Sequence, residues 1–171
     1  YLSGYSRRPI GGLTRLNANG SLDSLTVAVI NPDSENKPLD GFDTVATFNG
    51  GLQGSVNNLF PTAEDGVIAV GSFFNHYRID YNYSSRENKR FIYSKVAGIA
   101  KLRMDGSLDS SFSYNNAGFN GFINNSIQLN DGRIIVVGKF SSFNGVTANN
   151  IVCILPSGEI DRSFTAAGGS D

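Results

Sequence analysis

The sequence predicts an all-β protein built from repeated four-stranded antiparallel units, and three observations lead to that prediction. A short polar turn motif occurs three times, at residues 17–25, 103–112 and 155–164. A longer motif at residues 54–73 returns at residues 121–140. The composition of the 171 residues, with 20 glycines and 12 phenylalanines, favours many short strands joined by tight turns. Helical periodicity is absent over any ten residues.

The short motif aligns on three glycines, Gly20, Gly106 and Gly158, at intervals of 86 and 52 residues. Each glycine follows an apolar segment of similar pattern, at residues 13–16, 99–102 and 151–154. We therefore predict a strand, a turn and a short strand in every copy, with additional material in the first interval.

The longer motif predicts a hairpin. Residues 123–129 are extended, Asn130-Asp131-Gly132 supplies the positive φ angles of a tight turn, and residues 133–140 return. The run from Ile134 to Gly138 is continuously apolar, which predicts a strand covered on both faces. The two motifs together make four strands in about 50 residues, which is the size of a β-propeller blade.

The blades divide the chain 1–171 as follows. Residues 12–25 form half a blade, residues 54–112 form a blade with an inserted hairpin at 75–97, and residues 121–164 form a regular blade. Residues 26–53 are an inserted inter-blade loop. Two and a half blades do not close a ring. We therefore expect this segment to be part of a larger propeller, with completion by self-association as the alternative.

The pattern resembles the delta-60 repeat, a bacterial β-propeller repeat of largely uncharacterised function. Residues 121–164 carry the resemblance most fully, in Asn130-Asp131-Gly132, in the segment from Gly138 to Gly145, and in the segment from Ser157 to Phe164. Leu25-Thr26 departs from it, because the expected phenylalanine is missing, and so do the two insertions. The resemblance implies an extracellular or cell-surface location.

In antiparallel blades the recurring turns are expected on one face and both insertions on the opposite face. Variable loops on a rigid scaffold are where binding usually occurs. The hairpin insertion has a net charge of +3, from five basic and two acidic side chains, and the loop 26–53 has −3, from four acidic side chains and one lysine. Opposite charges predict that the two insertions pack together.

The inserted hairpin holds four of the seven tyrosines and the only histidine. Alternation on both sides of residues 84–88 predicts two strands. We take the following residues as candidate ligand-binding residues: Tyr77, Arg78, Tyr81, Tyr83, Arg90, Phe91 and Tyr93. They predict an aromatic platform for a protein or glycan. The alternative is that the rings only pack across their own hairpin. The absence of tryptophan weakens the hypothesis that these residues bind a glycan.

Metal binding and catalysis find little support. Residues 31–35 suggest calcium, but no bidentate acid follows at the required spacing. His76 has no partner for a triad and no metal-ligand spacing, and Cys153 lies inside an apolar run. Three aspartates recur once per blade, which predicts a structural role as acceptors of backbone N–H groups: Asp23, Asp109 and Asp161.

The function expected is therefore a non-catalytic propeller segment that binds a protein or glycan through the face carrying the insertions, with no cofactor and no metal. A net charge of −1 favours neither nucleic acid nor anionic membranes, and no apolar run is long enough to enter a membrane. The first alternative is a purely structural spacer in a large surface or phage-like protein. A glycoside hydrolase is a third, because acids such as Asp33, Asp43 and Asp80 are expected on that face without a motif that pairs them.

Overall fold

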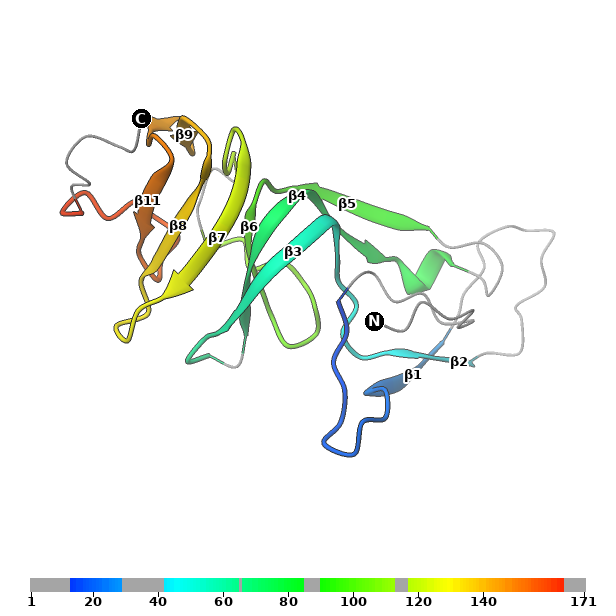
Figure 1. Ribbon diagram of the computed structural model, residues 1–171. Coiled ribbons are helices and arrows are strands. Elements are labelled where there is room, and N and C mark those ends of the chain that lie inside the picture. Colours follow the sequence, from blue (N-terminus) through cyan, green and yellow to red (C-terminus); the bar gives the residue numbers. More distant parts are fainter. Residues whose placement is uncertain (1–12, 29–41, 65, 85–89, 113–116, 165–171) are drawn as a thin grey trace.

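The computed structural model describes residues 13–28, 42–64, 66–84, 90–112 and 117–164. Apart from one 3-10 helix, η1, every regular element in these ranges is a strand, and all strand pairs are antiparallel, as Figure 1 shows. The all-β prediction is thus confirmed. The elements are β1 (Ser24–Ala28), β2 (Phe42–Ala46), β3 (Gly51–Pro61), β4 (Val67–Ile79), η1 (Tyr81–Tyr83), β5 (Phe91–Lys95), β6 (Ile99–Leu102), β7 (Phe122–Gln128), β8 (Ile134–Lys139), β9 (Ser142–Phe143), β10 (Val146–Thr147) and β11 (Ile151–Ile154).

The strands form two blades and part of a third. In the first blade β4 lies between β3 and β6, and in the second blade β8 lies between β7 and β11. The fourth strand of each unit is reduced to a single bridge. These bridges are Leu16↔Leu22 in the half blade, Leu102↔Leu108 in the first blade and Ile154↔Ile160 in the second.

The three copies of the polar turn adopt one geometry. Gly20, Gly106 and Gly158 have φ values of 81°, 80° and 88°. Each glycine N–H donates to the carbonyl three residues earlier at 2.8 Å. Side chains other than glycine rarely adopt this left-handed conformation, which explains why the same residue recurs in all three copies.

The recurring aspartates act as acceptors, as predicted. One carboxylate oxygen of Asp109 accepts hydrogen bonds from the backbone N–H and the hydroxyl of Ser111, at 3.1 and 2.7 Å. Asp161 binds Ser163 in the same way, at 2.9 and 2.6 Å. The Nζ of Lys101 lies 3.3 Å from the other oxygen of Asp109.

Asp23 departs from the prediction, because the described donors to its carboxylate are side chains and not a backbone N–H. Leu25 stands where the other two copies have serine, so no hydroxyl is present there. Instead the hydroxyl of Thr47 donates to Asp23 at 3.0 Å, and Arg15 pairs with the carboxylate. Because Thr47 directly follows β2, this bond extends the pairing of β1 with β2 by one residue.

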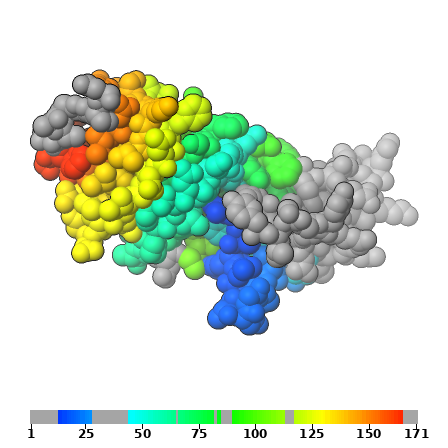
Figure 2. All heavy atoms as spheres, in the orientation of Figure 1, coloured from blue at the N-terminus to red at the C-terminus, as the bar shows by residue number. Residues whose placement is uncertain are grey.

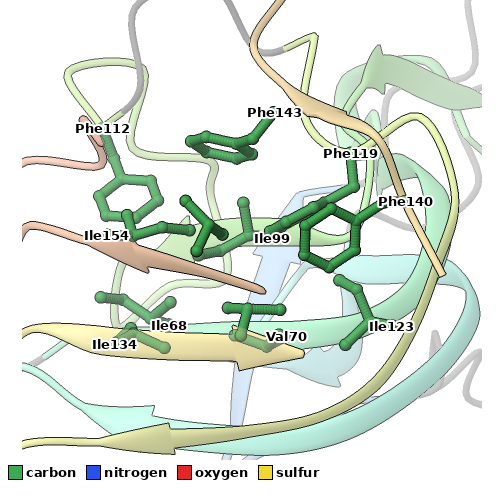
Figure 3. Close-up of a cluster of buried hydrophobic side chains, with 12 residues drawn as sticks. Ile68, Val70, Ile99, Phe112, Phe119, Ile123, Ile134, Phe140, Phe143 and Ile154 are labelled. Carbon is green, nitrogen blue, oxygen red and sulfur yellow. The ribbon is translucent and has the colours of Figure 1, made fainter. Parts of the chain in front are cut away.

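The main core lies between the two blades. Figure 3 shows Ile68, Val70 and Ile99 of the first blade facing phenylalanine rings and aliphatic side chains of the second. Phe143 is completely buried there, with its ring centroid 4.7 Å from that of Phe119. In Figure 2 the yellow atoms of the second blade lie directly against the cyan and green atoms of the first. A second cluster, around Leu102, joins the first blade to the half blade.

Both insertions contain paired strands, although only the second was predicted as a hairpin. Residues 26–53, expected as a loop, contain β2 and the start of β3, and β2 pairs with β1 from Ser24↔Ala46 to Ala28↔Phe42. In the second insertion β4 continues to Ile79 and pairs with β5. Residues 77–83, expected as one strand, therefore end as a strand at Ile79 and continue as η1.

Candidate functional site

The inserted hairpin brings three aromatic rings onto one face. Tyr77 lies directly opposite Tyr93, and Ile79 lies opposite Phe91. Residues that face each other across antiparallel strands project to the same side, as do residues two apart on one strand. The ring centroids of Tyr77 lie 5.7 Å from Phe91 and 6.0 Å from Tyr93, and those of Phe91 and Tyr93 are 6.2 Å apart.

These rings pack on each other and still face solvent. The side chain of Tyr93 is 58% exposed, Phe91 is also exposed and Tyr77 is half-buried. Burial raises the pKa of the Tyr77 hydroxyl, with a smaller contribution from Tyr93. The sequence left open whether these rings pack across their own hairpin or stay exposed. In the structure they pack on one another, and Phe91 and Tyr93 are also exposed.

The rings line a cavity of about 460 Å³, here called the aromatic groove. Its other walls are Arg78, Ile79, Tyr81 and the chain from Phe48 to Gly54. Of the seven candidate residues, five line this groove: Tyr77, Arg78, Tyr81, Phe91 and Tyr93. In the described part of the chain β3 pairs only with β4, so the groove includes backbone at the edge of a sheet.

The remaining two candidates lie apart from the groove. The guanidinium carbon of Arg90 lies 4.8 Å from the centre of the Tyr83 ring, a cation–π contact. A buried serine fixes this end of the hairpin, because the hydroxyl of Ser84 donates to the Asp80 carbonyl at 2.7 Å and accepts from the Arg90 N–H at 3.0 Å. These two hydrogen bonds of Ser84 stabilise a turn that contains residues 81–83, although the alternation of these residues predicts a strand.

The floor of the groove comes from a segment that sequence reasoning missed. The side-chain amide of Asn49 donates to the Ile79 carbonyl at 2.8 Å and accepts from the Ile79 N–H at 2.9 Å, as a paired strand residue would. Gly50 has no room for a side chain, because a Cβ there would lie 2.0 Å from the Gly106 carbonyl oxygen. The Asn-Gly-Gly run at residues 49–51 is the sequence signal for this close approach.

The turn at Gly106 corrects the prediction of two separate faces. Its carbonyl oxygen lies 2.9 Å from Nε2 of buried His76, and the Asn49 N–H donates to the Asp105 carbonyl at 2.7 Å. This turn therefore contacts both insertions, although the turns and the insertions were expected on opposite faces. The β-bulge between Gln53 and Gly54, opposite β4, accompanies this departure from regular pairing. Burial lowers the pKa of His76.

The turns that line the other end of the blades follow the prediction. Residues 61–64, residues 128–132 and Pro156 surround one hollow, so the hairpin turns of both blades and the last turn of the second blade share a face.

The two insertions touch at Tyr81, in addition to the contact of Asn49 with Ile79. The Tyr81 hydroxyl donates to the Ala46 carbonyl of β2 at 3.3 Å. The predicted charge attraction rests largely on residues 33–40 and 86–89, which lie outside the described ranges. Contact between the insertions is thus shown at Tyr81, and its electrostatic origin stays a prediction.

The described residues offer little to catalysis or metal binding. Among them, no group of three His, Cys, Asp or Glu side chains is placed to hold a metal ion. The predicted calcium site at residues 31–35 lies outside the described ranges, and so does Asp33, one of the acids considered for glycoside hydrolysis. Another of those acids, Asp43, has a side chain outside the described part of the structure. Burial raises the pKa of the Cys153 thiol, which disfavours the nucleophilic thiolate. No helix in the described ranges has the length and apolar character needed to cross a membrane.

Comparison with known families defines the class of protein. Residues 94–112 and 129–164 match a family described as a domain of unknown function (DUF5122) beta-propeller. The matched residues lie in both blades and include β6, β8 and β11. The chain thus contains a β-propeller domain of unknown function and is similar to this family over those residues. No curated protein and no solved structure matches the chain.

Proposed function

We propose that this protein is a non-catalytic β-propeller segment that binds a protein or glycan partner through the aromatic groove. The observation that carries the proposal is the convergence of Tyr77, Phe91 and Tyr93 on one open cavity beside the edge of β3. A volume of about 460 Å³ is in the range of ligand sites. Exposed tyrosine and phenylalanine are enriched where proteins bind partners.

The groove is held rigidly, which favours binding. The two Asn49 hydrogen bonds fix β4 at Ile79, and the two Ser84 hydrogen bonds fix the far end of the hairpin. A rigid site loses less conformational entropy when a partner binds, so more of the contact energy contributes to affinity.

A protein is the first choice of partner. In the described part of the chain β3 pairs only with β4, so its other edge can pair with an extended peptide, and the rings supply an apolar wall beside it. A glycan is the second choice. The amide of Asn75, which donates to Gln53 at 3.1 Å, lies on the same face as Tyr77, and sugars bind where amides adjoin aromatic rings.

A purely structural spacer is the alternative function. The hydrogen bond of Tyr81 to β2 supports it, because that ring contributes to packing between the two insertions. The exposure of Tyr93 and Phe91 favours binding over this alternative, since a spacer gains nothing from exposed rings.

Three further properties belong to this proposal. We assign the blades to the delta-60 repeat, and with it an extracellular or cell-surface location, on the motifs around Gly138 and Asp161. The protein is not an enzyme, since the groove lacks a buried acid–base pair. It binds neither nucleic acid nor membranes, because its net charge is close to zero.

Selection from a random linear peptide library and from a glycan array tests the proposal. We expect Tyr93→Ala to lower the affinity for the selected ligand at least about tenfold, because exposed aromatic anchors dominate such interfaces. Ile92→Ala is the matched control. Its side chain is 44% exposed on the same strand but points to the other face, so affinity should change less than about twofold. Equal losses in both variants, or none in either, would remove the groove as the site.

A further inference from the structure

The two blades allow one surface to be compared in two environments. In the first blade four residues form the face that meets the second blade: Phe60, Ile68, Val70 and Ile99. They belong to three strands, and their register is Phe60↔Ile68 and Val70↔Ile99. The second blade covers this face so fully that Val70 is 0% exposed.

The second blade carries the same face at equivalent positions, and we call it the outer face: Ile127, Ile135, Val137 and Ile151. Its register is Ile127↔Ile135 and Val137↔Ile151, identical to that of the first blade. All four side chains are again apolar. Here, however, Val137 is 36% exposed and Ile127 is 55% exposed, while the other two are half-buried.

Two more equivalent pairs agree with this contrast. Phe112 is buried between the blades, whereas Phe164, one repeat later, is only half-buried. Asn57 crosses the junction and donates its side-chain N–H to the Ile123 carbonyl at 3.2 Å. Asn124 stands at the equivalent place in the second blade and is exposed.

We propose that the outer face binds a further blade of the same repeat. That blade presents branched aliphatic side chains where the second blade has Ile134 and Val136, and phenylalanine where it has Phe119 and Phe143. Asn124 donates a hydrogen bond to the backbone of its first strand. This inference is independent of the aromatic groove, which lies on the inserted hairpin.

A complete blade fits this face better than a second copy of the chain. The first blade shows that a complete blade buries such a face. Among the described residues of a second copy, the surface equivalent to the covering side of a blade is available only at the half blade. There the equivalent of fully buried Leu102 and Ile154 is Leu16, one exposed leucine beside a single bridge.

The test adds one blade to the whole chain and asks whether Val137 becomes buried. The repeat length of 52 residues means that a second copy of residues 113–164, placed directly after Phe164, continues the pattern in register. Val137→Asp is made in the 171-residue chain and in the extended chain, and the thermal midpoint is measured for each. Val70→Asp serves as the internal reference for a buried position, and Val146→Asp, at an exposed site on β10, as the surface control.

We expect Val137→Asp to change the midpoint of the 171-residue chain by less than about 2 °C, as an exposed substitution does. In the extended chain it should lower the midpoint on the order of 10 °C, as Val70→Asp does, because it buries an unpaired charge. Asn124→Ala should destabilise only the extended chain, by as much as Asn57→Ala. Equal effects of Val137→Asp in both chains, or separate unfolding of the added blade, overturn the proposal. Sedimentation equilibrium supplies the other outcome, since a dimer of the 171-residue chain that Val137→Asp dissociates makes a second copy the occupant and also overturns it.

Discussion

Phe143 offers the sharpest test of the core between the blades. Its ring is completely buried against Phe119. A buried phenylalanine removes at least about 150 Å² from water, worth about 4 kcal/mol at ~25 cal/mol per Å². Alanine keeps part of this, while the lost ring contact adds about 0.5–1.5 kcal/mol. Phe143→Ala should therefore lower the free energy of unfolding by about 3–5 kcal/mol, as large-to-small core substitutions do.

Urea unfolding followed by far-ultraviolet circular dichroism measures this loss, since the chain has no tryptophan to serve as a fluorescent probe. Phe122→Ala is the control. That ring is 71% exposed on β7, so its removal should change the free energy of unfolding by no more than about 0.5 kcal/mol. Phe143→Leu, with an expected loss of about 1–2 kcal/mol, keeps the comparison possible if the alanine variant does not fold. A loss below about 1 kcal/mol for Phe143→Ala, or one equal to that of Phe122→Ala, would refute the inter-blade core.

Three other predictions follow from single residues. Hydrogen bonds from Ser163 and Arg133 lower the pKa of Asp161 to about 2 from 3.8. The stabilising contribution of this carboxylate is therefore present above about pH 4 and is lost as the pH falls towards 2. Asp161→Asn should reduce the loss of stability over that pH range, whereas Glu159→Gln, at an exposed position, should not. Burial lowers the pKa of His76 below 6.5, so the unfolded chain binds the proton more readily and stability should fall as the pH drops below about 6.5. An imidazole titration by NMR with a midpoint above 6.5 would contradict this, and His76→Gln should weaken the pH dependence. Gly106→Ala should cost at least about 2 kcal/mol more than Gly20→Ala in urea unfolding, because both have φ near +80° but only at Gly106 does a new Cβ lie 2.6 Å from the Gly50 nitrogen; equal losses would show that backbone strain alone matters.

The repeated turns and the blades were predictable because their signals are local. Gly20, Gly106 and Gly158 each sit in a short polar segment whose backbone requires glycine, and the alternation of two motifs gives the strand order. The recurrence of Asp109 and Asp161 once per blade likewise indicated a structural role, which their bonds to serine confirm. Such features depend on residues only a few positions apart.

The aromatic groove was predictable only in part. The pairing of Tyr77 with Tyr93 follows from alternation on two neighbouring strands. The contribution of Asn49, and the contact of His76 with Gly106, join segments about 30 residues apart, and no periodicity reports such contacts. Alternation also extended the strand too far, because the two Ser84 hydrogen bonds that start the turn depend on a single side chain.

The proposed function depends on the aromatic groove as the binding surface of this protein. Backbone and side-chain NMR shifts, followed while the selected peptide or glycan is added to the 171-residue chain, test that role of the groove. We predict that the largest changes fall on Gly51, Tyr77, Phe91 and Tyr93, and that Tyr93→Ala abolishes them while Ile92→Ala does not. Changes centred on Ile127 and Val137, with the groove resonances unmoved, would contradict it.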